Sequence, residues 1–376
     1  MRTTLSSLVV LTASLLACGS DVQNQPGTGG SGATGGTGGA GATGGTGGTG
    51  GTGGTGGTGG FGDPGVTPPP EPADGIPGDG TGYAFVIDQL FMGDTDRNGS
   101  PSPNAWKTLG YDLDGKVSTK RSTDLCMPNA GGSPTTVYPD GDDGRDNAFG
   151  KMLLPIFTGL SQDFSGQIND SLQASDGSFL IEMPSLGLSP SYVGLEGRLF
   201  QSGPVSNPAF DGSDTFPIGA QSLLSPSDPT STKWSFLQTY VNQHTMVMSP
   251  SGDVRLVLDT AGFQMAFDIH SAVIAMDMAP DRSAAVNGVI AGVLDTEEHI
   301  AVFQQLAGSF DPGLCSGTTF EAIADQVRQA SDILVDGTQD PNQTCNGISI
   351  GIGFTATAVQ LSGITPAPTP PPDPCP

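Results

Sequence analysis

The first residues whose types and spacing point to chemistry form the run Asp94-Thr95-Asp96-Arg97-Asn98-Gly99. Calcium prefers six to eight oxygen ligands, and alternate side chains on a tight glycine-containing turn point inward toward one ion. An EF-hand also needs a glutamate at loop position twelve, where this chain has Ala105, and Pro101 and Pro103 interrupt any exiting helix. The pattern therefore excludes an EF-hand and leaves a calcium-stapled loop as one interpretation.

More carboxylates follow in the same region. Asp112 and Asp114 lie within Tyr111–Gly115, and the acidic run 140–147 comes after them. Calcium is the one cofactor that this region predicts. The predicted ligands are Asp94, Asp96, Asn98, Asp112 and Asp114. The alternative is a solvated, turn-rich loop, because Asp, Asn and Gly form turns without any metal.

Two other patterns resemble catalytic arrangements. The run 347–351 matches the G-x-S-x-G elbow around Ser349, but that motif needs a strand-to-helix turn, and here a strand pattern continues through it. Asp268 and His270 share one face of a strand, as a base and its orienting carboxylate would, and equally as two residues of a polar sheet face. No catalytic residue is assigned on either pattern.

Alternating apolar residues predict most of the elements around these residues. Strands are expected at 83–92, 179–183, 193–200, 254–258, 263–278, 289–294 and 348–356. In the last of these, Ile348, Ile350, Ile352 and Phe354 share one face. Helices are expected at 296–307, ending at Gly308, and from a capping box at Thr318–Glu321 onward to about Leu334.

Many short strands with helices grouped late in the chain favour a mainly β fold. We expect a β-sandwich, with a jelly roll as its nearest analogue, carrying a helical insertion near the C-terminus. The expected domain spans 80–365, and a Pro-rich tail occupies 366–376.

The chain of 376 residues has a formal charge of −25, with 13 basic and 38 acidic residues. Nucleic-acid binding needs basic residues against phosphates, so this balance argues against it. The negative charge attracts cations and favours solubility.

The N-terminus begins Met1-Arg2 and continues with a short apolar run that ends in Leu15-Leu16-Ala17-Cys18-Gly19. This arrangement is typical of a secretory signal and resembles the lipobox of bacterial lipoproteins. The resemblance implies a signal peptide at 1–17 and acylation of Cys18, with palmitate among the acyl chains. Several acyl chains anchor a protein stably, and the outer membrane or cell surface is the expected location.

Thr-Gly-Gly repeats and a proline cluster follow Cys18. No apolar residue recurs there, so residues 18–79 are expected to form a disordered linker.

Four further cysteines, in a chain that we expect to be exported, predict two disulfides with three possible pairings. Cys315 with Cys345 is favoured because the two residues flank one predicted helix, and Cys126 with Cys375 then follows by elimination.

Several segments together resemble a group of uncharacterised lipoproteins from myxobacteria. They include Gly93–Asp96, Ala105–Lys107, Gly110–Gly115, Gly144–Gly150 and Ile348–Phe354. The resemblance spans about residues 83–360 and implies export and kinship, with no activity attached.

Two functions follow as hypotheses. The first is a membrane-anchored binding or structural module, calcium-stabilised, with a glycan, cell-wall component or surface protein as ligand. The second is an extracellular hydrolase of a cell-envelope polymer, which needs a cleft with opposed ionisable groups.

Overall fold

Strands make up most of the computed structural model, which describes residues 63–160, 163–174, 177–249, 252–260, 263–369 and 372–375. The predicted signal peptide, Cys18 and the Thr-Gly-Gly repeats lie outside these residues. The strands are β1 (Tyr83–Phe91), β2 (Phe179–Met183), β3 (Tyr192–Gln201), β4 (Thr215–Gly219), β5 (Trp234–Asn242), β6 (Thr245–Met248), β7 (Val254–Thr260), β8 (Phe263–Met278), β9 (Ala284–Asp295) and β10 (Gly347–Thr365).

Eight of these strands close into an antiparallel barrel. Their order is β1-β2-β3-β5-β6-β8-β9-β10, and β10 returns to pair with β1 from Ala84 opposite Val359 to Phe91 opposite Gly353. Closure leaves no unpaired edge between the first and last strands, which is the usual solution for an antiparallel sheet of this size. The expected β-sandwich is therefore wrong in its architecture, although the mainly β class is confirmed.

The interior of the barrel is filled by one apolar core. It takes side chains from all eight strands, and an eight-stranded barrel is just wide enough for side chains to fill it. On β10 the predicted alternation is confirmed, because Ile348, Ile350, Ile352 and Phe354 all belong to this core. The intervening Ser349, Gly351 and Gly353 face the other way.

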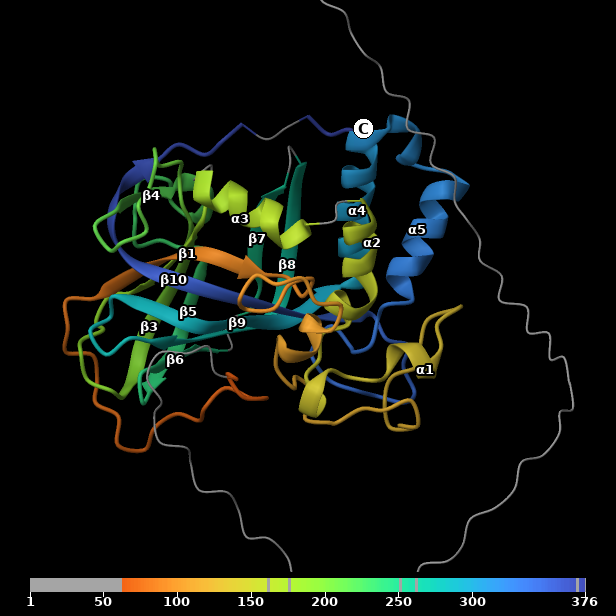
Figure 1. The fold of residues 1–376 in the computed structure, drawn as a ribbon, viewed down its shortest axis with the longest axis horizontal. Coiled ribbons are helices and arrows are strands. Elements are labelled where there is room, and N and C mark those ends of the chain that lie inside the picture. Colours follow the sequence, from red (N-terminus) through yellow and green to blue (C-terminus); the bar gives the residue numbers. More distant parts are fainter. Residues whose placement is uncertain are drawn as a thin grey trace, which may run out of the picture. The chain divides into compact units, whose positions relative to one another are not determined.

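Helices extend this core at one end of the barrel (Figure 1). They are α2 (Leu154–Leu160), α3 (Phe164–Ala174), α4 (Thr296–Phe310) and α5 (Thr318–Arg328), and α1 (Pro134–Val137) lies in the loop region before them. Asn169 of α3 donates to the backbone oxygen of Leu90 at 3.0 Å and accepts from its nitrogen at 2.7 Å. A helix side chain thus takes the place of a strand partner where β2 has ended.

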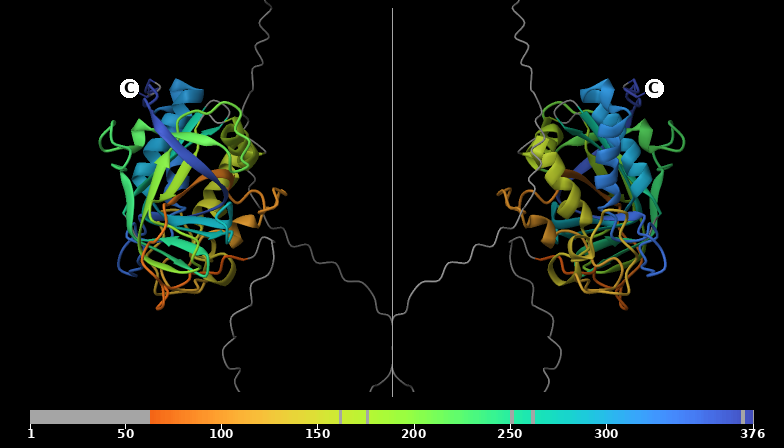
Figure 2. Two further views of the ribbon diagram at one scale, coloured as in Figure 1. Left: turned by 90° about the vertical axis from the view of Figure 1, so that its left-hand side faces the viewer. Right: turned by 90° about the vertical axis from the view of Figure 1, so that its right-hand side faces the viewer.

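Outside the barrel, loops cover the apolar side chains that face away from the core. β4 runs parallel to the end of β10 and packs Phe216 and Ile218 on Val86 and Phe200. The turn η1 (Ala105–Thr108) leads to Tyr111, which packs on Val289 and its neighbours. In both side views the late helices α4 and α5, in blue, lie near the C-terminus of the chain (Figure 2).

The two late helices confirm their predicted positions and correct their predicted ends. Asp295 caps α4, and Gly308 does not stop it, because the helix continues to Phe310. A Cβ at Gly308 would lie 2.3 Å from the Sγ of Cys375, so this glycine permits close packing of a disulfide. The capping box at α5 is wrong, since Gly317 is the N-cap and no side chain caps the helix, which ends at Arg328.

Both predicted disulfide pairings are wrong. The bonds join Cys126 to Cys345 and Cys315 to Cys375. The loop of Cys126 pairs with the approach to β10, where the Cys345 nitrogen donates to the Met127 oxygen at 2.9 Å, so a residue 219 positions away is the nearer partner. The second bond ties part of the predicted loose tail to the end of α4. Two disulfides indicate an oxidising compartment outside the cytoplasm.

The expected linker boundary at residue 79 also differs from the structure. All described residues, from Asp63 on, belong to one compact unit. The Ile76 nitrogen donates to Ser191 at 3.4 Å and the Ile76 oxygen accepts from Val193 at 2.9 Å, so this stretch pairs beside β3. Within the described part of the chain, no helix is long and apolar enough to cross a membrane.

Candidate metal centre

The acidic loops between β1 and α2 lie on the outer face of β10. Asn147 fixes them there, because its Nδ2 donates to the oxygen of Gly351 at 3.1 Å and its Oδ1 accepts from the Gly351 nitrogen at 3.2 Å. The backbones approach so closely that a Cβ at Gly351 would lie 2.4 Å from the Cα of Gly110. The glycines on this face of β10 therefore provide the platform on which the acidic loops rest.

Three carboxylates come together on this platform. One oxygen each of Asp112, Asp114 and Asp146 lies within 4.8 Å of the others. Backbone amides orient them, since Asp146 accepts from Leu113 at 2.7 Å and Asp112 accepts from Gly115 at 2.7 Å. Carboxylate oxygens at this spacing are suited to a hard divalent cation.

Two further carboxylates adjoin this group. Asp332 accepts from the nitrogen and the hydroxyl of Ser349, at 2.9 and 2.6 Å, and Asp140 accepts from the nitrogen of Ser118. The hydroxyl of Ser118 is buried and has no protein partner. The described structure therefore gathers five carboxylates, and the charges of Asp114, Asp140 and Asp332 all act on Asp146.

The electrostatics of this cluster are unfavourable to ionised carboxylates. Burial raises the pKa of Asp146 well above its usual value, and the charges of Asp114, Asp332 and Asp140 raise it further. Burial also raises the pKa of Asp140 to about 8 and that of Asp332 to about 6, and it raises the pKa of Asp114. Without a cation, a pKa of about 8 leaves the carboxyl of Asp140 largely protonated near neutral pH.

The nearby lysines are already engaged. Lys116 donates to the carboxylate of Asp124 at 2.6 Å. Lys151 donates to the backbone oxygens of Val137 and Pro139, at 2.9 and 2.6 Å, and burial lowers its pKa. Neither ammonium is hydrogen-bonded to a carboxylate of the cluster, and the charge of Lys151 only partly offsets the raised pKa values of Asp140 and Asp332.

The loop tied down by the Cys126–Cys345 disulfide covers one side of the cluster. Gln339 donates from Nε2 to Asp114 at 2.9 Å and accepts at Oε1 from the nitrogen of Cys126 at 2.9 Å. Because Cys126 is bonded to Cys345, this disulfide joins the loop of Gln339 to the acidic loops.

The predicted calcium loop lies apart from this group. Asp94 bonds through both carboxylate oxygens to the nitrogen and hydroxyl of Ser165 in α3. Asp96 accepts from the nitrogens of Asn98 and Ser100, each at 2.9 Å, as a turn former does. The structure thus brings together Asp112 and Asp114 and leaves Asp94, Asp96 and Asn98 outside their group.

Asp146 is the cluster member that the sequence prediction omitted. It lies in the acidic run 140–147, where its side chain is buried while those of Asp142 and Asp143 are exposed. Asp332 lies near the end of the expected helix and also reaches the cluster only through folding. A buried aspartate gives no local sequence signal, because burial depends on distant segments.

The residues of the two patterns that resembled catalytic arrangements, around Ser349 and at Asp268 and His270, form hydrogen bonds that link neighbouring elements of the fold. Ser349 lies within β10, as expected, and its hydroxyl bonds Asp332 and the nitrogen of Ala148. His270 bonds Asp253 at 2.7 Å and Glu298 at 3.2 Å rather than Asp268, whose carboxylate bonds Arg255. Both pairs tie neighbouring elements together.

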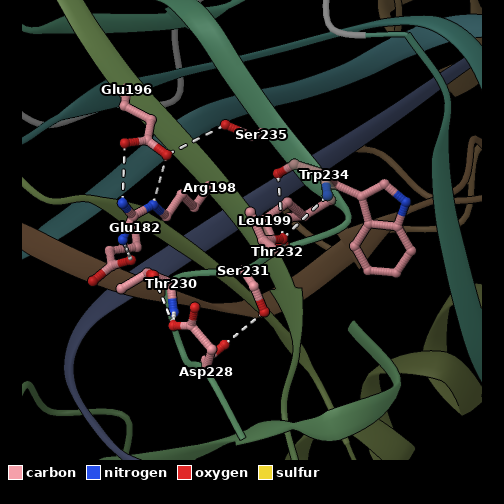
Figure 3. A network of polar contacts seen from close by, with 10 residues as sticks. All are labelled: Glu182, Glu196, Arg198, Leu199, Asp228, Thr230, Ser231, Thr232, Trp234 and Ser235. Atoms are coloured by element: carbon pink, nitrogen blue, oxygen red, sulfur yellow. Dashed lines mark hydrogen bonds and ion pairs between the residues drawn. The ribbon is translucent and has the colours of Figure 1, made fainter. Parts of the chain in front are cut away.

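A separate polar network crosses the outer faces of β2, β3 and β5 (Figure 3). Arg198 pairs with Glu196 at 2.8 Å and with Glu182 at 3.2 Å, and Ser235 donates to Glu196 at 3.3 Å. The hydrogen bonds from Arg198 lower the pKa of Glu196, whereas burial raises that of Glu182. Both carboxylates bind one guanidinium, so they are not an open acid–base pair.

A groove of about 340 Å³ lies between the acidic loops and α2. It is lined by Trp106, Pro103, Ser102, Asp94 and Lys151 among others. Because Asp94 and Lys151 are bonded elsewhere, the groove offers an aromatic face with polar groups rather than two opposed catalytic groups.

No family model matches this chain, and no curated protein or solved structure matches it either.

Proposed function

We propose that this chain is an exported lipoprotein that presents a calcium-stabilised β-barrel as a binding or structural module. The observation that carries the cation is the cluster of Asp112, Asp114 and Asp146, with Asp140 and Asp332 adding charge beside it. A divalent ion at this position replaces the protons that the buried carboxylates otherwise require. Oxygen-only ligands favour calcium over softer metals.

Calorimetric titration of chelator-treated protein tests this proposal. We expect one calcium ion per chain, and a loss of affinity of about tenfold or more in Asp146→Asn, because one charged ligand is removed. Asp170→Asn, an exposed change on α3, is the matched control and should leave binding unchanged. Absence of binding at millimolar calcium, or equal affinity in Asp146→Asn, would refute the cation site.

The lipid anchor rests on the Cys18 motif and agrees with the disulfides and acidity of the chain. Cys18→Ser should move the protein from the membrane pellet to the soluble fraction after cell breakage. Retention of that variant in the pellet would contradict lipid anchoring.

For the ligand we propose a glycan, supported by the groove beside Trp106. Indole rings stack on sugar faces while neighbouring polar groups accept or donate hydrogen bonds. A polysaccharide-binding screen on the chain from Asp63 on should find a ligand whose binding is lost in Trp106→Ala and kept in Trp234→Ala. Equal loss in both variants would remove this groove as the site.

A further inference from the structure

The segment from Asp63 to Pro72 lies extended along the outside of the barrel, at the orange end of the described chain (Figure 1). The oxygen of Pro69 accepts from the hydroxyl of Tyr240 at 2.6 Å, and that of Pro70 accepts from Asn242 at 2.9 Å. The oxygen of Val66 accepts from the nitrogen of Asp112 at 2.8 Å. An extended proline-rich segment offers mainly carbonyl oxygens, so a surface that supplies donors is matched to it.

A buried arginine holds the start of this segment. The side chain of Arg145 is 1% exposed, and within the described ranges its one carboxylate partner at ion-pair distance is Asp63. Its remaining protein acceptor is the backbone oxygen of Asp142, at 3.1 Å. A buried guanidinium without a carboxylate is costly, so Asp63 supplies a charge that the folded barrel needs.

The charge of Asp63 also acts on a second buried arginine, Arg97. Arg97 donates to the oxygen of Gly288 at 3.1 Å, and burial lowers its pKa to about 10, an effect that the charge of Asp63 opposes and that of Arg145 reinforces. The Nη2 of Arg97 and the Nε of Arg145 are buried without a protein partner. The two buried guanidinium groups therefore place positive charge beside the start of this segment.

We propose that this surface is a docking site for an acidic, proline-rich extended segment, and that residues 63–72 of the same chain occupy it as a latch. Arg145 pairs with the carboxylate of Asp63, the charge of Arg97 lies nearby, and Tyr240 and Asn242 donate to the proline carbonyls. The tether then enters the module at Asp63, and the segment after it is part of the folded unit.

The connection to the barrel favours the same chain as occupant. Ile76 pairs with the start of β3, and Asp79 accepts from the hydroxyl of Tyr192 at 2.7 Å. The few residues between Pro72 and Ile76 hold the latch at a high effective concentration beside its dock.

Hydrogen exchange of the full chain tests the latch, with the amide of Asp112 as reporter because it donates to Val66. The double variant Asp63→Asn/Tyr240→Phe should exchange this amide about tenfold faster or more. Asp74→Asn, which removes an exposed carboxylate just after this segment, should not change it. The amide of Ile350, in the barrel core, should stay protected in both and so monitors global unfolding.

Three results would overturn the latch. Equal exchange of Asp112 in the double variant and the parent chain removes the docking role of Asp63 and Tyr240. Protection that falls on dilution assigns the dock to a second copy of the chain. A difference that appears in calcium and vanishes in chelator assigns the protection to the metal centre instead, so both conditions are measured.

Discussion

Removal of the Cys126–Cys345 disulfide tests both the connectivity and its role beside the acidic cluster. The bond closes a loop of 219 residues. In the chain-entropy account, this cross-link restricts the unfolded chain and so raises the free energy of unfolding by about 5 kcal/mol at 25 °C. The corresponding value for the 60-residue loop of Cys315–Cys375 is about 4 kcal/mol. For a folded part of roughly 300 residues, about 5 kcal/mol corresponds to a fall in Tm of about 8 °C.

The perturbation is the double variant Cys126→Ser/Cys345→Ser, with Cys315→Ser/Cys375→Ser as the matched control. Calorimetry in calcium should give the larger fall in Tm for the first pair. The first pair should also weaken calcium binding, because Gln339 loses the covalent support that holds it on Asp114. The control should bind calcium as the parent chain does.

Peptide mapping without reduction checks the premise directly. It should recover Cys126 linked to Cys345 and Cys315 linked to Cys375. A peptide linking Cys315 to Cys345 would refute the reasoning, as would an equal loss of calcium binding in both variants.

Three further predictions concern the same surroundings. In chelator, the free energy of unfolding measured by urea titration should fall as pH rises from about 4 to about 8. The reason is that the folded-state pKa values of Asp332 (about 6) and Asp140 (about 8) exceed those of the unfolded chain. Saturating calcium should flatten this dependence on pH. Burial lowers the pKa of His270, but its hydrogen bonds to the carboxylates of Asp253 and Glu298 outweigh burial, so the folded-state pKa is raised. The stability that this histidine contributes is complete below its unfolded pKa and is lost as pH rises through the folded value. His270→Gln should remove that part of the pH profile, and an unchanged profile would contradict the pairing. Gly351→Ala should lower the free energy of unfolding, measured in denaturant, by about 1–3 kcal/mol, because the new Cβ displaces the acidic loop. Gly363→Ala lies on the same strand with open space around it and should lower this free energy by about 1 kcal/mol or less. Equal losses would argue against the close approach at Gly351.

Periodicity in the sequence was sufficient to locate the elements whose burial is one-sided. All seven predicted strands are present, because alternation such as that of Ile348 to Phe354 reflects an inward and an outward face. The strands β4, β5 and β6 were missed, as were α2 and α3. β5 is interrupted by polar and exposed residues such as Gln238 and Leu237, so it carries no clean alternation.

The sequence by itself also determined the acidic character, the cysteine count and the region in which Asp112 and Asp114 lie. The tertiary structure alone decided that the sheet closes, since closure is a pairing of β1 with β10, about 270 residues apart. It alone decided which aspartates meet and which cysteines bond. Each of these outcomes depends on contacts between distant segments, and local residue patterns carry no information about which distant segment will arrive.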